Sequence, residues 1–282
     1  MRPASLAVIG LGAIGGSLAW QAHRAGVSRV VGYSPEPAEG IQALKAGAVT
    51  ELADSALRAL RGAELVVLAV PPGAAMDLME PLSSRLESGA LLTDVCSVKA
   101  PVVERAVAVG LGDRFAGAHP LAGTHGSGFG SALPDRFRGC VVYICESGTP
   151  EGHRVAQSIS GFWEHTLEAV PVRIDARAHD RQLAWTSHLP QAVAYALAKT
   201  LADQGLGGVS FGSGAKDSTR IAASSPSIWL DIFLYNQEAV SHALQRTEES
   251  ISELRRTLES GDVARLEAFL RTAQIFRRGI DG

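Results

Sequence analysis

The sequence predicts an α/β fold in which a doubly wound sheet domain is followed by an all-helical domain. Three observations lead to this prediction. Short apolar stretches alternate with helical patterns through the first half of the 282-residue chain. A glycine-rich turn directly follows the first apolar stretch, and beyond residue 176 long helical patterns occur without a convincing strand. We expect the sheet domain to cover residues 1–172 and the helical domain residues 173–282.

The glycine-rich turn lies between the apolar run of residues 6–9 and a helical pattern. It reads Gly10-Leu-Gly-Ala-Ile-Gly15, the G-x-G-x-x-G spacing of dinucleotide-binding Rossmann domains. In that motif Gly10 permits a tight turn, Gly12 lets the backbone approach a pyrophosphate, and Gly15 lets the helix pack closely on the strand. The helix N-terminus offers free N–H groups to the phosphates. A glycine-rich turn without a ligand is the alternative.

The other elements of the first half follow from apolar runs and the residues that end them. Continuous apolar runs bounded by glycine or proline predict buried parallel strands, separated by segments with helical spacing. The predicted strands are 6–9, 29–33, 64–70, 90–94, 115–118 and 139–145. The predicted helices after the glycine-rich turn are 38–46, 73–86 and 98–109. Ligands bind at the carboxyl ends of such strands, and Ser34, Pro71, Ser97 and His119 each follow a strand.

The second half is predicted to be helical. Its predicted helices are 183–190, 191–203, 226–248, 248–258 and 262–276. The first of these contains Pro190, which removes a backbone donor and bends its helix. The last two form an amphipathic pair around Gly261, with Asp262 as the expected cap of the final helix. A helical domain of roughly 110 residues with so many apolar faces favours burial against the first domain and against a second copy of the chain.

Composition argues against several classes of function. The formal net charge is −3 and no block of lysine and arginine stands out, so nucleic-acid and membrane-surface binding are not expected. No apolar stretch approaches the ~18 residues that span a bilayer, and the N-terminus does not read as a signal peptide. The spacing of Cys96, Cys140 and Cys145 suggests no disulfide framework, which fits a reducing cytoplasm.

The end of the second strand normally indicates which nicotinamide cofactor is bound. An acidic residue there hydrogen-bonds the ribose hydroxyls of NAD, but here Ser34 follows Tyr33. Loss of a carboxylate removes repulsion of a 2′-phosphate, so the sequence leans slightly toward NADP tolerance, although no arginine lies alongside. Glu36 is an alternative source of the acidic group, and a simple turn at Ser34 is another alternative. The expected cofactor is therefore NAD or NADP.

Polar residues follow two further strands. Within Asp94-Val-Cys-Ser-Val-Lys99, Ser97 is placed to donate to a substrate oxygen or to the cofactor amide; the alternative is helix capping, with Lys99 as a solvated charge. His119 suits a general base because its ordinary pKa lies near neutrality, and a hydrogen-bonded structural histidine is the alternative. No metal is expected, because His119 and His125 lack a third ligand at a sensible spacing.

Two features of the helical half also suit a ligand site. Pro190 breaks a helix beside Ser187 and His188 and leaves polar groups to be met by something else, which is typical of a pocket wall. A packed helix junction is the alternative. Arg220 lies among small and apolar residues, where a guanidinium binds a carboxylate through two parallel hydrogen bonds. A salt bridge with Asp217 or another acid is the alternative for Arg220.

Together these segments resemble the prephenate/arogenate (cyclohexadienyl) dehydrogenase family of tyrosine biosynthesis. The resemblance covers nearly the whole chain in the family's order. It rests on Gly10-Leu-Gly-Ala-Ile-Gly15, Asp94-Val-Cys-Ser-Val-Lys99, His119-Pro-Leu-Ala-Gly-Thr124, His179-Asp180, Ser187-His-Leu-Pro190 and Asp217-Ser-Thr-Arg220-Ile-Ala222. It implies a Rossmann domain followed by a helical domain that forms a homodimer, with the active site between the two domains and a cytoplasmic location.

The resemblance also implies a reaction and residue roles. Hydride would leave ring C4 of prephenate or arogenate for NAD(P)+, and the ring carboxylate would leave as CO2, giving 4-hydroxyphenylpyruvate or tyrosine. His119 would accept the proton of the C4 hydroxyl, Ser97 would lie between that hydroxyl and the nicotinamide, and Arg220 would hold the ring carboxylate. The expected pocket residues are His188, Thr124, Gln191 and Ser187. The expected cofactor-binding residues are Gly10, Leu11, Gly12, Ala13, Ile14, Gly15, Ser34, Val70 and Pro71.

Two positions depart from the family pattern. His125 stands where many relatives have an acid, and Gln191 stands where many have histidine. Gln191 is expected near the substrate side chain, so the choice between prephenate and arogenate stays open. The amide at Gln191 and the missing acid after Tyr33 are compatible with an enzyme that uses arogenate and tolerates NADP. Rival interpretations are a 3-hydroxyacid dehydrogenase, an imine reductase or a non-catalytic NAD(P)-binding regulator.

Overall fold

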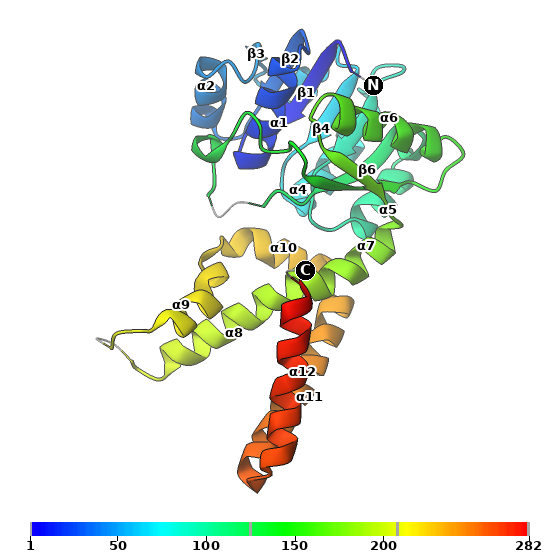
Figure 1. Ribbon diagram of the computed structural model, residues 1–282. Helices are drawn as coiled ribbons and strands as arrows, with labels where there is room; N and C mark the ends of the chain where they lie inside the picture. Colours follow the sequence, from blue (N-terminus) through cyan, green and yellow to red (C-terminus); the bar gives the residue numbers. More distant parts are fainter. Residues whose placement is uncertain (1, 124–125, 207–208, 281–282) are drawn as a thin grey trace.

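The structure is a computed structural model that describes residues 2–123, 126–206 and 209–280. Within these residues an eight-stranded sheet with helices on both faces precedes a group of helices (Figure 1). In spatial order the strands are β3 (Glu51–Leu52), β2 (Arg29–Tyr33), β1 (Ser5–Ile9), β4 (Leu65–Leu68), β5 (Leu91–Asp94), β6 (Phe115–Pro120), β7 (Val141–Glu146) and β8 (Val170–Arg173). The winding reverses between β1 and β4, and this switch point is where open α/β sheets bind ligands.

Neighbouring strands run parallel except at β6 and β7, which pair antiparallel with His119 opposite Tyr143. A parallel pair needs a crossover connection that is usually helical. In its described residues (121–123 and 126–140) the connection carries only the 3-10 turn η2 (Phe129–Ser131), without a crossover helix, and β7 runs in the opposite direction. The expectation of parallel strands throughout is therefore wrong at this pair.

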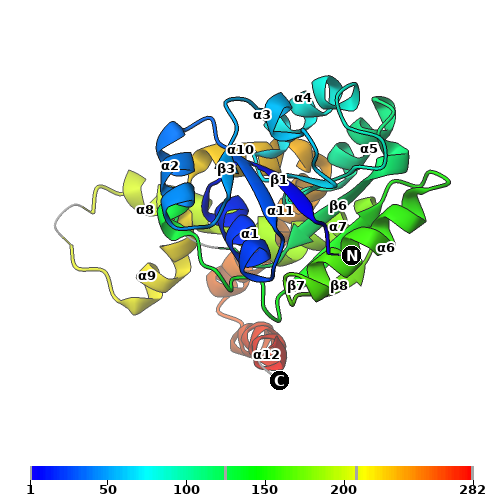
Figure 2. The same ribbon diagram turned by 90° about the horizontal axis from the view of Figure 1, so that it is seen from above.

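Helices cover both faces of the sheet because its central strands are apolar on both sides. Leu6 and Val8 of β1 face one buried core, and Ala7 and Ile9 face the other, as the alternation of side chains along a strand requires. Helices α1 (Ala13–Arg24) and α6 (Gly152–His165) line the first core. Helices α3 (Ala56–Ala59), α4 (Pro72–Ser83) and α5 (Ala100–Ala108) line the second, on the opposite side of the sheet (Figure 2).

The predicted strands and helices of the first half lie close to their expected positions, and α2 (Pro37–Lys45) follows β2 as expected. Four elements were not predicted: β3, α3, α6 and β8. Both β3 and α3 are too short to show a periodic pattern. The strand β8 occupies a segment that we expected to be only a link, and it adds to the edge of the sheet by pairing with β7.

The second half consists of helices, as predicted. They are α7 (Ala176–Leu183), the π-helical turn η3 (Ala184–His188), α8 (Leu189–Asp203), α9 (Ser213–Thr219), the 3-10 turn η4 (Arg220–Ala223), α10 (Pro226–Tyr235), α11 (Gln237–Ser260) and α12 (Val263–Ile280). Asn236 interrupts the predicted helix over 226–248. Gly261 takes a left-handed conformation between α11 and α12, and Asp262 Oδ1 accepts the Arg265 N–H at 3.0 Å, which confirms the predicted cap.

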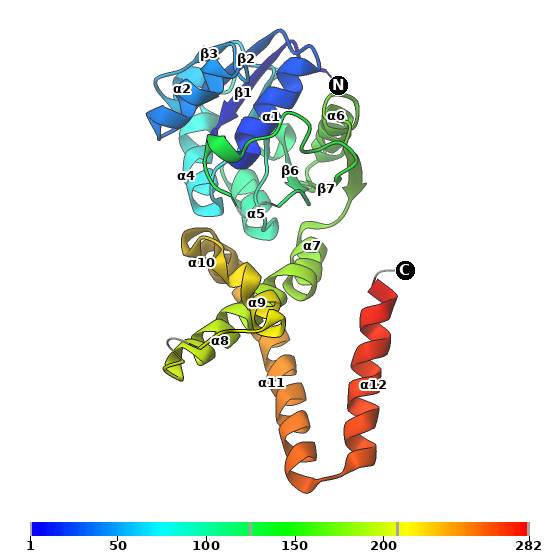
Figure 3. The same ribbon diagram turned by 60° about the vertical axis from the view of Figure 1, so that its left-hand side comes forward.

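The hairpin of α11 and α12 projects away from the sheet domain (Figure 3). Every residue of α12 is at least partly exposed, including its apolar residues Val263, Leu270 and Phe276. None of the described helices combines the length and the apolarity needed to cross a membrane. The hairpin therefore presents an apolar surface that the single chain does not cover.

Candidate active site

The glycine-rich turn lies at the switch point of the sheet, between β1 and the N-terminus of α1. Gly10 has a φ of +97°, and a methyl group on it would collide with the carbonyl oxygen of Ala69. A methyl group on Gly15 would collide with the carbonyl oxygen of Gly10. On Gly12, by contrast, the nearest atom to a methyl group would be a carboxylate oxygen of Glu39, 4.0 Å away. The turn thus fits a dinucleotide: it is tightly packed beneath and open where a pyrophosphate would approach.

The other predicted cofactor residues of this region lie around the same turn and at the end of β4. Leu11 is fully buried, and its side chain packs against the position of Gly32 on β2. Ala13 begins α1 and is buried, and Ile14 packs partly on the core. Val70 and Pro71 follow β4 at the same edge of the sheet, where Pro71 precedes the first residue of α4.

An unexpected carboxylate lies beside the end of β2. The Ser34 hydroxyl donates to Glu39 Oε2 at 2.7 Å and accepts the Glu36 N–H at 3.2 Å. Glu39 belongs to the first turn of α2, whereas Glu36 is exposed. The lean toward NADP rested on the absence of an acid after Tyr33, and the structure places the Glu39 carboxylate beside that position. Sequence reasoning missed Glu39 because it considered acids only at the end of the strand.

A buried ion pair joins the carboxyl ends of β5 and β6. The side chains of Lys99 and Asp94 are in contact and 0% exposed. Lys99 Nζ also donates to the carbonyl of Ala118 at 2.9 Å, and Asp94 Oδ1 accepts the Ala118 N–H at 3.2 Å. Burial disfavours the charge on Lys99, but Asp94 outweighs it and raises the pKa of Lys99. Lys99 is therefore not a solvated charge, and the pair fixes the strand immediately before His119.

Ser97 lies in the turn between the two members of that ion pair. It is half-buried, and its hydroxyl makes no hydrogen bond to another described residue. A serine in this position can donate to or accept from a bound molecule without breaking an existing contact.

His119 ends a chain of hydrogen bonds that begins at the N-terminus of α5. The backbone N–H groups of Lys99 and Ala100 donate to the carboxylate of Asp180 at 2.7 Å and 2.8 Å. His179 Nδ1 lies 2.7 Å from Asp180 Oδ1. His179 Nε2 in turn lies 2.8 Å from His119 Nδ1. The chain of contacts joins α5 and β6 of the sheet domain to α7 of the helical half.

The direction of these hydrogen bonds fixes the tautomers of both histidines. Since the Asp180 carboxylate accepts, His179 donates from Nδ1 and, when neutral, accepts at Nε2. His119 then donates from Nδ1 and carries its lone pair on Nε2. Burial, reinforced by His179, Lys99 and His188, lowers the pKa of His119 well below its usual range. Burial also lowers the pKa of His179, although Asp180 opposes this shift. Near neutral pH, His119 is therefore neutral, and its Nε2 is unprotonated.

His188 has the opposite tautomer. It closes the π-helical turn η3 and is 1% exposed. Asn236 Nδ2 donates to the backbone oxygen of Asp180 at 2.8 Å and to His188 Nδ1 at 3.1 Å. Neutral His188 therefore carries its proton on Nε2, which has no hydrogen-bond partner among the described residues. Burial lowers the pKa of His188 to about 4, so its side chain is neutral near pH 7.

The remaining predicted substrate residues lie around the start of α8. Ser187 is half-buried in η3, and Arg220 is exposed at the start of η4. Gln191 is buried, and its Nε2 donates to the carbonyl of Ile221 at 2.8 Å, so it holds the segment next to Arg220. Thr124 and His125 lie outside the described residues. Within the described residues, no three histidine, cysteine or acidic side chains are grouped as metal ligands.

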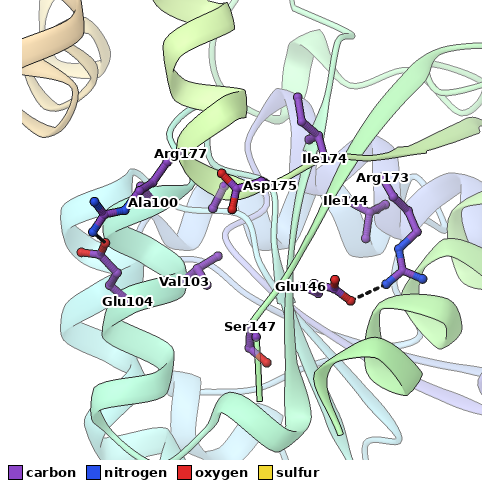
Figure 4. Close-up of a pocket in the computed structure, with 12 residues that line it drawn as sticks. Ala100, Val103, Glu104, Ile144, Glu146, Ser147, Arg173, Ile174, Asp175 and Arg177 are labelled. Atoms are coloured by element: carbon purple, nitrogen blue, oxygen red, sulfur yellow. Dashed lines mark hydrogen bonds and ion pairs between the residues drawn. The ribbon is translucent and has the colours of Figure 1, made fainter. Parts of the chain in front are cut away.

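A cavity of about 460 Å³ lies apart from these residues, where the edge of the sheet meets α5 and α7 (Figure 4). Its charged side chains are engaged with one another: Arg173 bonds Glu146 at 2.6 Å and Arg177 bonds Glu104 at 2.7 Å. Asp175 on its wall caps α7. The cavity contains none of the predicted site residues, and we assign the site to the carboxyl edge of the sheet.

Family models and known proteins match nearly the whole chain. The nucleotide-binding domain of prephenate dehydrogenase matches residues 18–170, and the dimerisation domain of prephenate dehydrogenase matches residues 175–272. Prephenate dehydrogenase of Bacillus subtilis is 32% identical over 98% of this chain and 76% of its own length.

Two solved structures are similar over nearly their whole length. Prephenate dehydrogenase from A. aeolicus, solved with hydroxyphenyl propionate and NAD+, has a TM-score of 0.90 and 31% identity, covering 98% of each chain. Synechocystis arogenate dehydrogenase has a TM-score of 0.78 and 27% identity, covering 98% of this chain and 99% of its own. These matches confirm the resemblance seen in the motifs: the chain belongs to the prephenate dehydrogenase family of oxidoreductases.

Proposed function

We propose that His119 is the general base in this chain's reaction, the NAD+-dependent oxidative decarboxylation of prephenate or arogenate. The observation that carries this assignment is the hydrogen-bond chain from Asp180 through His179 to His119. It leaves a lone pair on His119 Nε2 at the edge of the sheet where the glycine-rich turn also lies. The A. aeolicus relative was solved with NAD+ and an aromatic acid, which supports the same ligand classes for this chain.

The reaction needs one group that removes a proton and later returns it. A bound nicotinamide supplies the hydride acceptor for ring C4. His119 Nε2 takes the proton of the C4 hydroxyl as that oxygen becomes a carbonyl. When the ring carboxylate leaves as CO2, its bonding electrons complete the aromatic ring, and His119 returns the proton to the same oxygen. The Nδ1–H bond to His179 orients the ring of His119, and the Asp180 carboxylate beyond stabilises the imidazolium.

Several other residues are proposed to bind the substrate. Arg220 pairs with the ring carboxylate, because a guanidinium binds such a group through two parallel hydrogen bonds. The Nε2–H of His188 donates to a second substrate oxygen. Ser97 lies between the C4 hydroxyl and the nicotinamide. Ser187, Thr124 and Gln191 complete the proposed substrate pocket.

A substitution of His119 tests the assignment. We expect His119→Asn to lower kcat by about 10²-fold or more, because the amide cannot take a proton. The dissociation constant for NADH should stay unchanged, since His119 contacts the substrate and not the glycine-rich turn. His165→Asn, an exposed position at the end of α6, serves as the matched control and should keep the kcat of the natural chain. An unchanged kcat in His119→Asn would remove His119 as the base.

A further inference from the structure

We propose that Glu39 makes the cofactor site selective for NAD+ over NADP+ by binding the hydroxyls of the adenosine ribose. This inference rests on the proposed use of a nicotinamide cofactor. It concerns a residue on helix α2, five positions after Ser34, which follows β2 where such an acid usually stands.

The Glu39 carboxylate is held by one hydrogen bond and lies beside two glycines. Its Oε2 accepts the Ser34 hydroxyl at 2.7 Å, which ties the side chain to the end of β2. Its Oε1 lies 4.0 Å from the place of a methyl group on Gly12 and 3.3 Å from the place of one on Gly128. Glu39 is half-buried there. One carboxylate oxygen is thus held by the protein, and the other borders the space above the glycine-rich turn.

The adenosine ribose of a bound dinucleotide lies in that space above the glycine-rich turn. The pyrophosphate lies over the second glycine of the motif, and the ribose lies between it and the end of the second strand. A carboxylate oxygen at this point accepts hydrogen bonds from ribose hydroxyls. The same carboxylate repels the doubly charged 2′-phosphate of NADP+.

Among the described residues, no basic side chain contacts Ser34 or Glu39 to act as a clamp for a phosphate. Arg58 of α3 is already paired with Asp54 at 2.8 Å, and Arg29 lies at the opposite end of β2 from Ser34. The Ser34 hydroxyl cannot donate to a 2′-phosphate either, because it already donates its hydrogen bond to Glu39. Ser34 is therefore a positioning residue, which sets the orientation of the carboxylate.

The test measures cofactor binding by the full-length chain in the absence of substrate. Dissociation constants for NADH and for NADPH are determined by titration calorimetry for the natural chain and for Glu39→Gln, Ser34→Ala and Glu36→Gln. Glu36→Gln is the matched control, because it makes the same change at an exposed acid three residues earlier. Urea unfolding of each variant shows whether the fold is kept.

We expect the natural chain to bind NADH more tightly than NADPH. Glu39→Gln should reduce the ratio of the NADPH dissociation constant to the NADH dissociation constant at least about tenfold, which is the effect of one charge-assisted hydrogen bond. Ser34→Ala should give a smaller change in the same direction, and Glu36→Gln should leave the ratio within about twofold, below the scale of one hydrogen bond. A ratio unchanged in Glu39→Gln, or changed equally in Glu36→Gln, would overturn the proposal.

Failure of the proposed reaction has a different signature. If NADH binds with the expected selectivity but neither prephenate nor arogenate is turned over, the reaction assignment fails and the role of Glu39 stands. If turnover occurs and the natural chain binds NADPH at least as tightly as NADH, the role of Glu39 fails and the reaction stands.

Discussion

The tautomer of His119 depends on a residue 60 positions along the chain. His179 accepts the Nδ1–H of His119, and without that acceptor the proton is free to occupy either ring nitrogen. We therefore expect His179→Phe to lower kcat at least about tenfold. His179→Gln should recover part of the loss, because its amide oxygen can accept the same hydrogen bond. The measurement is kcat against pH with saturating substrate and NAD+.

The control for this pair is Tyr143→Phe. It removes a hydroxyl that accepts from Gln182 at 2.6 Å, keeps the ring that contacts His179, and leaves the hydrogen bonds between the histidines intact. Its kcat should match that of the natural chain. Equal losses in the Phe and Gln variants of His179 would show that the residue acts through packing and not through the tautomer of His119.

The site was predictable only where its signals are local in the sequence. His119 and Ser97 could be singled out because each follows an apolar run, and the glycine-rich turn has a fixed spacing. The tautomer of His188 depends on its hydrogen bond with Asn236, which is 48 residues away in the chain. His179 contacts His119 only when the two halves of the chain pack together. Glu39 could have been predicted from the sequence, because the first turn of the helix after β2 can face the end of that strand.

At the scale of elements, the ion pair of Asp94 and Lys99 joins β5 to β6 directly before the proposed base. Removing one partner of a buried pair leaves an uncompensated charge, so Lys99→Met should reduce the free energy of unfolding by about 3–5 kcal/mol. Asp94→Asn combined with Lys99→Met should recover part of that loss. The check is urea unfolding, with Lys45→Met at an exposed position as the control.

The double variant decides this prediction. If it is no more stable than Lys99→Met alone, the loss in the free energy of unfolding comes from lost packing and not from the unpaired charge of Asp94. In either case the sequence did not reveal the pair, because nothing in Asp94-Val-Cys-Ser-Val-Lys99 shows that the lysine turns inward toward the backbone of β6.

Helices and strands were predictable to different degrees. Pro190 predicted a break in its helix, and the structure shows a π-helical turn there that places His188 inward. The reversal at β7 was not predictable, because an apolar run gives no direction for its strand. The hairpin of α11 and α12 was visible in sequence because Gly261 and Asp262 supply a stop and a cap.

At the scale of the whole molecule, the hairpin of α11 and α12 exposes apolar side chains in the single chain. Phe276 is 72% exposed on α12, and the family's dimerisation domain matches residues 175–272, which include the first half of this helix. We propose that a second copy of the chain covers this face. The natural chain should then be a dimer by light scattering, and Phe276→Glu should dissociate it at the same concentration because a buried unpaired charge is costly.

Gln274→Glu adds the same charge on the same exposed helix and serves as the control for the dimer. It should leave the dimer intact if the apolar face, and not the charge of the helix, forms the contact. A natural chain that is monomeric, or a dimer that tolerates Phe276→Glu, would place the interface elsewhere.

The most direct test of the function is a two-by-two initial-rate assay, in which prephenate and arogenate are each supplied with NAD+ and with NADP+. We predict turnover of at least one substrate with NAD+, and a kcat/KM with NAD+ at least about tenfold above that with NADP+. No turnover in any of the four combinations, by a chain that binds NADH normally, would contradict the proposed reaction.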